Sequence, residues 1–214
     1  MYQTNPDVTR NVEILVRENQ RLKRRISALE AQNRLMSAGR SARFPVEFRS
    51  QFGEDALLWE LFGGRLDGYF IEVGAFDGYD CSVSYAFEAM GWNGLLIEAI
   101  PERFEECRKR RPHSRIVHSA LSCRGARGTA TFTVTEDQFG GMLSYLDPAS
   151  DHARAVSAKS RRTVEVPLTT MNDVLGDHQG EIDFAVIDVE GSELLLLDGF
   201  DLEKYRPKVL LIED

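Results

Sequence analysis

Short apolar runs without polar alternation recur along this chain, and helical stretches separate most of them. The runs that read as strands are 69–73, 94–97, 115–118, 128–134, 163–168, 184–187 and 209–212, and the expected helices are 54–62, 83–90, 101–110, 171–175 and 194–199. Strands that are apolar throughout are buried on both faces, and helices between them form the crossovers of parallel strands. The sequence therefore predicts an α/β, Rossmann-like fold, a mostly parallel sheet with helices on both faces.

The first 40 residues follow a heptad pattern instead. Val8, Leu15, Leu22, Leu29 and Met36 fall at position d, and Val12, Asn19, Ile26 and Asn33 fall at position a. Asparagine at position a pairs best with its own copy, which favours two parallel, in-register helices. We expect residues 1–40 to be a coiled-coil oligomerisation arm that forms a homodimer through residues 8–36. The alternative is one amphipathic helix packed on its own domain, residues 44–214.

Composition excludes several classes of protein. The net charge of −8 argues against a nucleic-acid-binding domain. No run of about 18 apolar residues is present, so we expect no transmembrane segment. The three cysteines, Cys81, Cys107 and Cys123, form no CxxC pair, which favours reduced thiols and a cytoplasmic location.

The ends of the expected strands carry glycines and acids. Parallel sheets bind ligands at the carboxyl ends of their strands, which places residues 74–78, Glu98, 119–122, 188–191 and 213–214 along one edge. The turn 74–78 has glycines that would admit a ligand close to the backbone, yet it has neither the lysine nor the spacing of a phosphate-binding loop. An acidic pocket suits a cationic, phosphate-free ligand such as S-adenosylmethionine. Glu98 can accept hydrogen bonds from the ribose hydroxyls of this ligand.

Several motifs together resemble the FkbM-type family of S-adenosylmethionine-dependent methyltransferases. They are SQFGED at 50–55, FIEVGAFDG at 70–78, GWNGLLIE at 91–98, ALS at 120–122 and IDVEGSE at 187–193. The resemblance implies a seven-stranded Rossmann-like sheet and O-methyl transfer to hydroxyls of sugars, glycans or natural products. The chain ends at the fifth strand of that fold, so we expect a C-terminally truncated domain.

The resemblance also implies the cofactor contacts. Glu72, Gly74 and Asp77 would line the methionine end; Glu98 and Ala99 would hold the ribose; Ser119, Ala120 and Leu121 would flank adenine; Asp188 and Val189 would lie near the reacting methyl; and Gln51, Asp55 and Ser82 would close the rim.

A hydroxyl acceptor needs a base or a metal ion. The catalytic candidates are Asp188, Glu190 and His152, the last in a polar stretch, 136–162, that reads as an acceptor lid. Carboxylates from Asp188, Glu213 and Asp214 would suit Mg²⁺. Two other classes of function stay open: a nicotinamide-dependent oxidoreductase, since Glu98 would also suit its ribose, and a non-catalytic coiled-coil scaffold with an inert Rossmann-like domain.

Overall fold

The computed structural model describes residues 6–136, 140–146, 150–157 and 160–213. The chain divides into two compact units. The first unit contains residues 1–67 and 81–91, and the second contains residues 68–80 and 92–214. Each unit is described on its own below.

The second unit is built on a parallel five-stranded sheet with the order β3-β2-β1-β7-β8. Its strands are β1 (Tyr69–Val73), β2 (Asn93–Glu98), β3 (Arg115–His118), β7 (Phe184–Ile187) and β8 (Val209–Ile212). The central strand β1 pairs with β2 and β7, so that Val73 lies opposite both Ile97 and Ile187. The sheet confirms the predicted α/β, Rossmann-like fold class.

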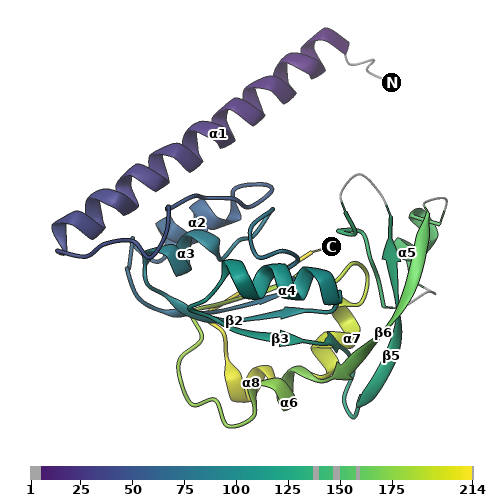
Figure 1. Ribbon diagram of the computed structural model, residues 1–214. Coiled ribbons are helices and arrows are strands. Elements are labelled where there is room, and N and C mark those ends of the chain that lie inside the picture. Colours follow the sequence, from purple (N-terminus) through teal and green to yellow (C-terminus); the bar gives the residue numbers. More distant parts are fainter. Residues whose placement is uncertain (1–5, 137–139, 147–149, 158–159, 214) are drawn as a thin grey trace. The chain divides into compact units, whose positions relative to one another are not determined.

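Helices cover both faces of this sheet (Figure 1). On one side lie α6 (Met171–Leu175), α7 (Glu193–Asp198) and α8 (Leu202–Tyr205), and on the other lies α4 (Pro101–Arg110). Alternate strand residues point to opposite faces. The first side therefore receives Ile71, Val73, Leu95, Ile97, Ala185 and Ile187, which pack with Met171, Val174 and Leu196 into the main core.

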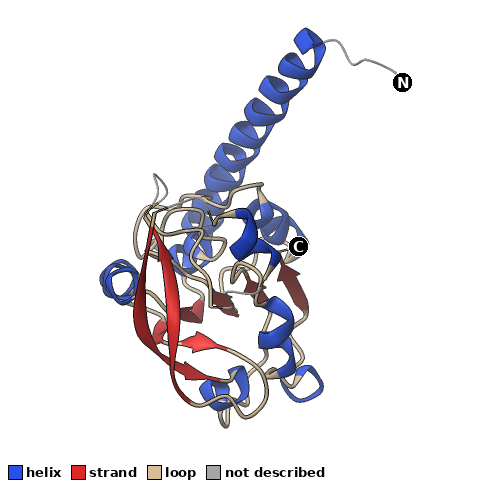
Figure 2. Ribbon diagram, turned by 90° about the vertical axis from the view of Figure 1, so that its right-hand side faces the viewer, coloured by secondary structure: helices blue, strands red, loops and turns tan. Residues whose placement is uncertain are grey.

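A second, smaller sheet has the order β4-β6-β5 (Figure 2). It contains β4 (Ala120–Leu121), β5 (Gly128–Thr135) and β6 (Arg161–Thr169), and β5 runs antiparallel to β6. The sequence predicted β5 and β6 as a pair of strands but not β4, nor the helices α5 (Asp151–Ala155) and α8. These three elements have two to five residues, too few to show a period.

The first unit contains the long helix α1 (Pro6–Ser37) with α2 (Glu54–Leu61) and α3 (Tyr85–Met90). α1 contacts both shorter helices. It ends just before a glycine: Gly39 has φ +64°, and the N–H of Arg40 donates to the carbonyl of Leu35 at 2.9 Å. Among the described residues, no helix is both long enough and apolar enough to cross a bilayer.

The turn after β1 lies between the ends of β2 and β7, the two strands that flank β1. The N–H groups of Gly74 and Ala75 both donate to the carbonyl of Ile97, at 3.0 and 3.1 Å. Gly74 has φ +79°, and a Cβ atom there would lie 1.8 Å from the carbonyl oxygen of Asp188. The sequence analysis attributed this glycine to a ligand; the structure gives a further reason for it, because the protein's own backbone occupies the space that a side chain would need.

Replacing Gly74 with alanine should therefore be far more damaging than the same change at Gly125. Gly125 also has a positive φ, +85°, but nothing lies within 4 Å of its Cβ position. We expect Gly125→Ala to cost about 1 kcal/mol of unfolding free energy, the backbone strain alone. Gly74→Ala should cost more than about 4 kcal/mol or prevent folding. Urea unfolding measures both, and equal losses would contradict the close approach.

Candidate functional site

The carboxyl ends of the parallel strands meet at one edge of the sheet, as the sequence predicted. In the register, Val73 is level with Ile97 and Ile187, and Ile187 is level with Ile212. The residues that follow these positions are the turn 74–78, Glu98, the loop 188–191 and Glu213. They make up the candidate site.

Glu98 is the last residue of β2 and joins two loops of the site. The residue is buried, with 6% of its surface exposed. One oxygen accepts the N–H of Phe76 in the β1 turn at 2.7 Å, and the other accepts the N–H of Ile100 at the start of α4, also at 2.7 Å. Burial raises the pKa of Glu98 to about 7, although these backbone donors oppose the shift.

Asp77 is buried and organises the β1 turn from within. One of its carboxylate oxygens accepts the N–H groups of Tyr79 and Asp80, at 2.9 and 2.8 Å. The other pairs with the guanidinium of Arg110. The sequence analysis expected Asp77 to line the methionine end of a cofactor. In the structure, these partners give it a role in holding the turn.

Glu72 is also buried, and its carboxylate faces a cation that the sequence analysis did not single out. Arg111 is fully buried, with its guanidinium 3.9 Å from Glu72 and 5.6 Å from the centre of the Phe70 ring. It also donates to the carbonyl of Gly78 at 3.1 Å. Arg111 follows the basic last turn of α4, so its sequence context is that of a solvated helix end.

The residues expected to flank adenine follow β3 of the larger sheet, and two of them form β4 of the smaller sheet. Ser119, Ala120 and Leu121 are all buried. The Ser119 hydroxyl is hydrogen-bonded to the carbonyls of Ala120 and Pro167, at 2.8 and 3.0 Å. Ala99, the second expected ribose residue, is partly buried and packs against the core of the smaller sheet.

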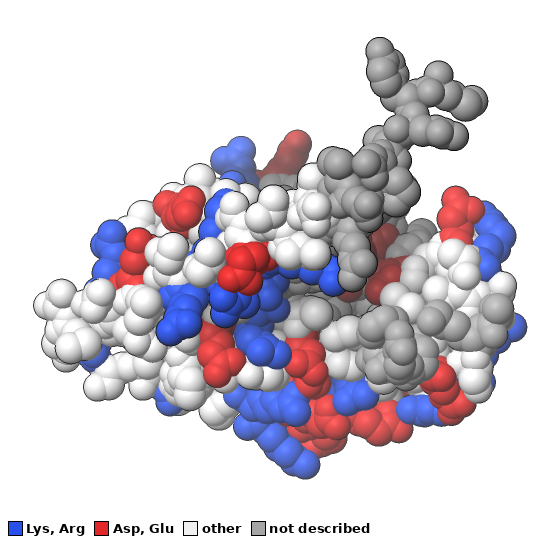
Figure 3. Space-filling model, turned by 90° about the horizontal axis from the view of Figure 1, so that it is seen from above, with Lys and Arg blue, Asp and Glu red and all other residues white. Residues whose placement is uncertain are grey.

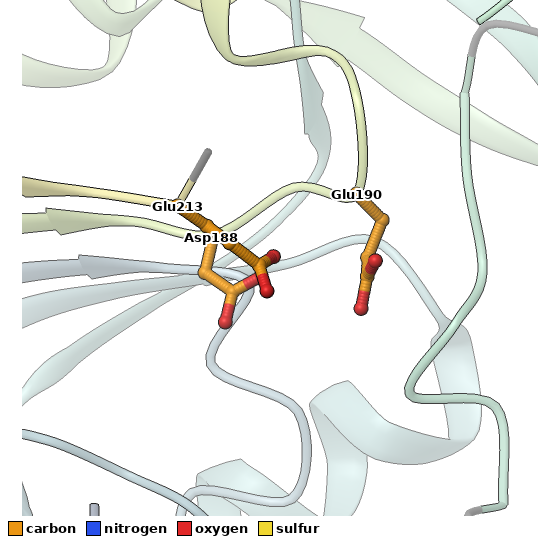
Figure 4. Close-up of side chains that lie close together, drawn as sticks. All are labelled: Asp188, Glu190 and Glu213. Atoms are coloured by element: carbon orange, nitrogen blue, oxygen red, sulfur yellow. The ribbon is translucent and has the colours of Figure 1, made fainter. Parts of the chain in front are cut away.

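Three carboxylates gather at the ends of β7 and β8. Asp188, Glu190 and Glu213 each have an oxygen within 4.8 Å of the others, and Figure 4 shows Asp188 and Glu213 pointing toward one another. Crowding by protein atoms, together with the negative charges of Glu213 and Glu190, raises the pKa of Asp188 well above its usual range. Asp214, the third predicted metal ligand, lies outside the described residues.

The loop that carries Asp188 and Glu190 is held by Glu193, at the start of α7. Its carboxylate accepts the N–H groups of Val189 and Gly191, both at 3.1 Å. Glu190 itself has a left-handed backbone, with φ +54°. The sequence analysis gave Glu193 no role. The pattern of an acid two residues after a glycine in a loop that leads into a helix could have indicated one.

His152 contacts the carboxylate cluster directly. Its Nδ1 lies 2.9 Å from a carboxylate oxygen of Glu190, and its Nε2 lies 3.0 Å from the carbonyl oxygen of Leu143. Each ring nitrogen therefore has a polar partner, and these contacts place His152 to orient Glu190. The role of His152 as a catalytic base stays a prediction.

The three expected rim residues belong to the first unit. Asp55 is fully buried and accepts the backbone N–H and the hydroxyl of Ser50, at 2.9 and 2.6 Å. Burial raises the pKa of Asp55. Gln51 is exposed and Ser82 is buried. Their role at the rim of the pocket stays a prediction.

Acidic and basic side chains are interspersed on the face shown in Figure 3. Domains that bind nucleic acid through the phosphate backbone gather Lys and Arg in one stripe or patch. On the face in Figure 3, Asp and Glu side chains lie among the Lys and Arg side chains.

The parallel sheet, the glycine turn after β1 and the acid that ends β2 define a Rossmann-like α/β domain. Residues 72–214 match the Methyltransferase FkbM domain family. The chain belongs to this family, and the resemblance noted in the sequence is confirmed. Searches of curated proteins and of solved structures found no match.

The raised pKa of Glu98 predicts a specific pH dependence of stability. Because folding raises this pKa from 4.5 to about 7, the folded state favours the protonated acid. The stability contribution is complete below pH 4.5 and is lost as the pH rises through about 7. Relative to Glu98→Gln, the wild type should lose about 3 kcal/mol of unfolding free energy over this range. Urea unfolding at several pH values measures the difference, and parallel profiles would contradict it.

Proposed function

We propose that this chain is an S-adenosylmethionine-dependent O-methyltransferase that acts on a hydroxyl of a sugar, glycan or natural product. Membership of the FkbM methyltransferase family supports the methyl transfer. The observation that carries the choice of cofactor is the carboxylate of Glu98, buried at the end of β2 and tied to the β1 turn.

The residues at the strand ends suit this cofactor. Each oxygen of Glu98 accepts one backbone N–H, and a carboxylate oxygen has a second lone pair that can accept a ribose hydroxyl. The nearby Asp188, Glu190 and Glu213 contribute negative charge, which favours a cationic ligand over a phosphate. Glu98 and Ala99 would hold the ribose, and Asp188 with Val189 would lie beside the amino-acid end.

When bound, S-adenosylmethionine supplies a methyl group that is already activated for transfer. The protein must then hold the acceptor hydroxyl in line and remove its proton. We assign the removal of this proton to Asp188. Its carboxylate lies beside Glu213, and the residue is exposed. His152 fixes the position of Glu190 through their 2.9 Å contact. Glu190 in turn would orient the acceptor.

The same carboxylates offer a second way to lower the barrier. Oxygen ligands from several acids suit a hard cation such as Mg²⁺, which would lower the pKa of a bound hydroxyl. Here the ligands would be Asp188, Glu213 and Glu190, with Glu190 taking the place that the sequence analysis gave to Asp214.

Cofactor binding is tested by calorimetric titration with S-adenosylhomocysteine and, separately, with NAD⁺. We expect S-adenosylhomocysteine to bind and NAD⁺ not to bind. Glu98→Gln should weaken binding about 10- to 100-fold, because a charged hydrogen-bond acceptor is lost. The control is Glu105→Gln, an exposed acid on α4 that pairs with Arg108, and it should leave affinity unchanged. Binding of NAD⁺ would favour the oxidoreductase, and binding of neither compound would favour the scaffold.

The cation is tested without an acceptor substrate, by titrating the protein with Mn²⁺ and recording the electron paramagnetic resonance of the free ion. We expect one bound ion per chain, lost in Asp188→Asn and kept in Asp67→Asn, an exposed acid outside the cluster. If the wild type binds no ion, the metal role fails, and Asp188 acts as a base alone.

A further inference from the structure

The apolar seam of α1 is exposed from Val12 to Met36. The apolar side chains at positions a and d in this range are 46% to 76% exposed: Val12, Leu15, Leu22, Ile26, Leu29 and Met36. A helix that used this stripe to pack on its own domain would bury it. Exposed apolar surface of this extent marks an interaction site.

α1 contacts its own unit through a different face. Its buried side chains are Ser27, Ala31 and Leu35, which take heptad positions b, f and c. Arg24, at another f position, donates to the carbonyls of Ser50 and Gln51. On a helical wheel these positions lie opposite the a and d seam. The helix is therefore anchored by one face and leaves the seam available to a partner.

We propose that the seam is occupied by the α1 helix of a second copy of this chain, parallel and in register. Asn19 and Asn33 take a positions, where an asparagine is best satisfied by the same residue of the other strand. An unrelated apolar helix would leave these two amides without partners in the seam. The pattern thus selects a second copy over other amphipathic helices.

The flanks of the seam are complementary in charge in this arrangement. In a parallel pair, position g of one helix faces position e of the other, five residues further along. Glu18 then faces the second copy's Lys23, and Arg25 faces its Glu30. Within the described part of a single chain, Lys23, Arg25 and Glu30 form no ion pair, whereas Glu18 pairs with Arg21.

A groove between α1 and α2 extends the surface beyond the seam. Its volume is about 410 Å³, and its walls include Asn19 and Lys23 of α1 with Phe52 and Leu57 from the α2 side. Asn19 belongs to the seam and to the groove, so a helix seated on the seam also borders the groove. Phe52 and Leu57 are 67% and 62% exposed. They would cover the flank of the second copy's helix.

Sedimentation velocity of the full chain at tens of micromolar tests the assembly. We expect a dimer that Leu22→Glu shifts to monomer, because the change places two like charges opposite one another in the seam. Leu194→Glu is the matched control: it adds the same charge at a leucine that is 83% exposed outside α1, and it should leave the dimer intact. A wild-type monomer, or a dimer unaffected by Leu22→Glu, would overturn the proposal.

Orientation and register need a second experiment. Leu22→Cys puts a thiol at a d position, where two parallel, in-register helices bring the same residue together. Mild oxidation should give a disulfide-linked dimer on a non-reducing gel. Arg17→Cys places a thiol at an exposed position outside the seam. This variant should give no more disulfide-linked dimer than the wild type, whose native thiols set the background. Equal cross-linking of the two variants would contradict a parallel, in-register pair.

The groove is tested by Leu57→Glu in the dilution series of the sedimentation experiment. If α2 covers the second copy's helix, Leu57→Glu should raise the dissociation constant of the dimer about tenfold. Leu194→Glu is again the control and should leave it unchanged. An unchanged dissociation constant would restrict the interface to the seam and refute the contribution of α2.

Discussion

The arrangement of the strand ends depends on one buried carboxylate. Glu98 accepts an N–H from the β1 turn and an N–H from the start of α4. It therefore connects the loops that follow the two adjacent strands β1 and β2. A buried carboxylate is costly, and the backbone donors offset part of that cost here. We propose that the same residue recognises a ribose, in which case the interaction that shapes the site would also contribute to its binding specificity.

The other acids at this edge divide into two groups. Glu72 and Asp77 are buried and lie against Arg111 and Arg110, so their charges are balanced within the protein. Asp188, Glu190 and Glu213 lie close together, and no Lys or Arg of the described residues forms an ion pair with Asp188 or Glu213. The electrostatic character of the site therefore comes mainly from the ends of β7 and β8, and less from the glycine-rich turn that first drew attention to it.

Much of the fold was predictable from local sequence. The strands β1, β3, β7 and β8 have the predicted limits, because each contains adjacent apolar residues and is flanked by polar residues or glycine. The partners of the buried acids were not predictable, since they lie far away in the chain: Arg110 is 33 residues from Asp77, and Phe76 is 22 residues from Glu98. The role of Gly74 was missed for the same reason, because the backbone of Asp188 that crowds it is brought there by the sheet.

A double-mutant cycle on the ligand tests the central role of Glu98 most directly. The affinities of S-adenosylhomocysteine and of its analogue without the two ribose hydroxyls are measured for the wild type and for Glu98→Gln. If Glu98 holds the ribose, removing the hydroxyls should weaken binding to the wild type at least about tenfold, and binding to the variant much less. An equal loss in both proteins would show that the hydroxyls do not contact Glu98 and would contradict the account.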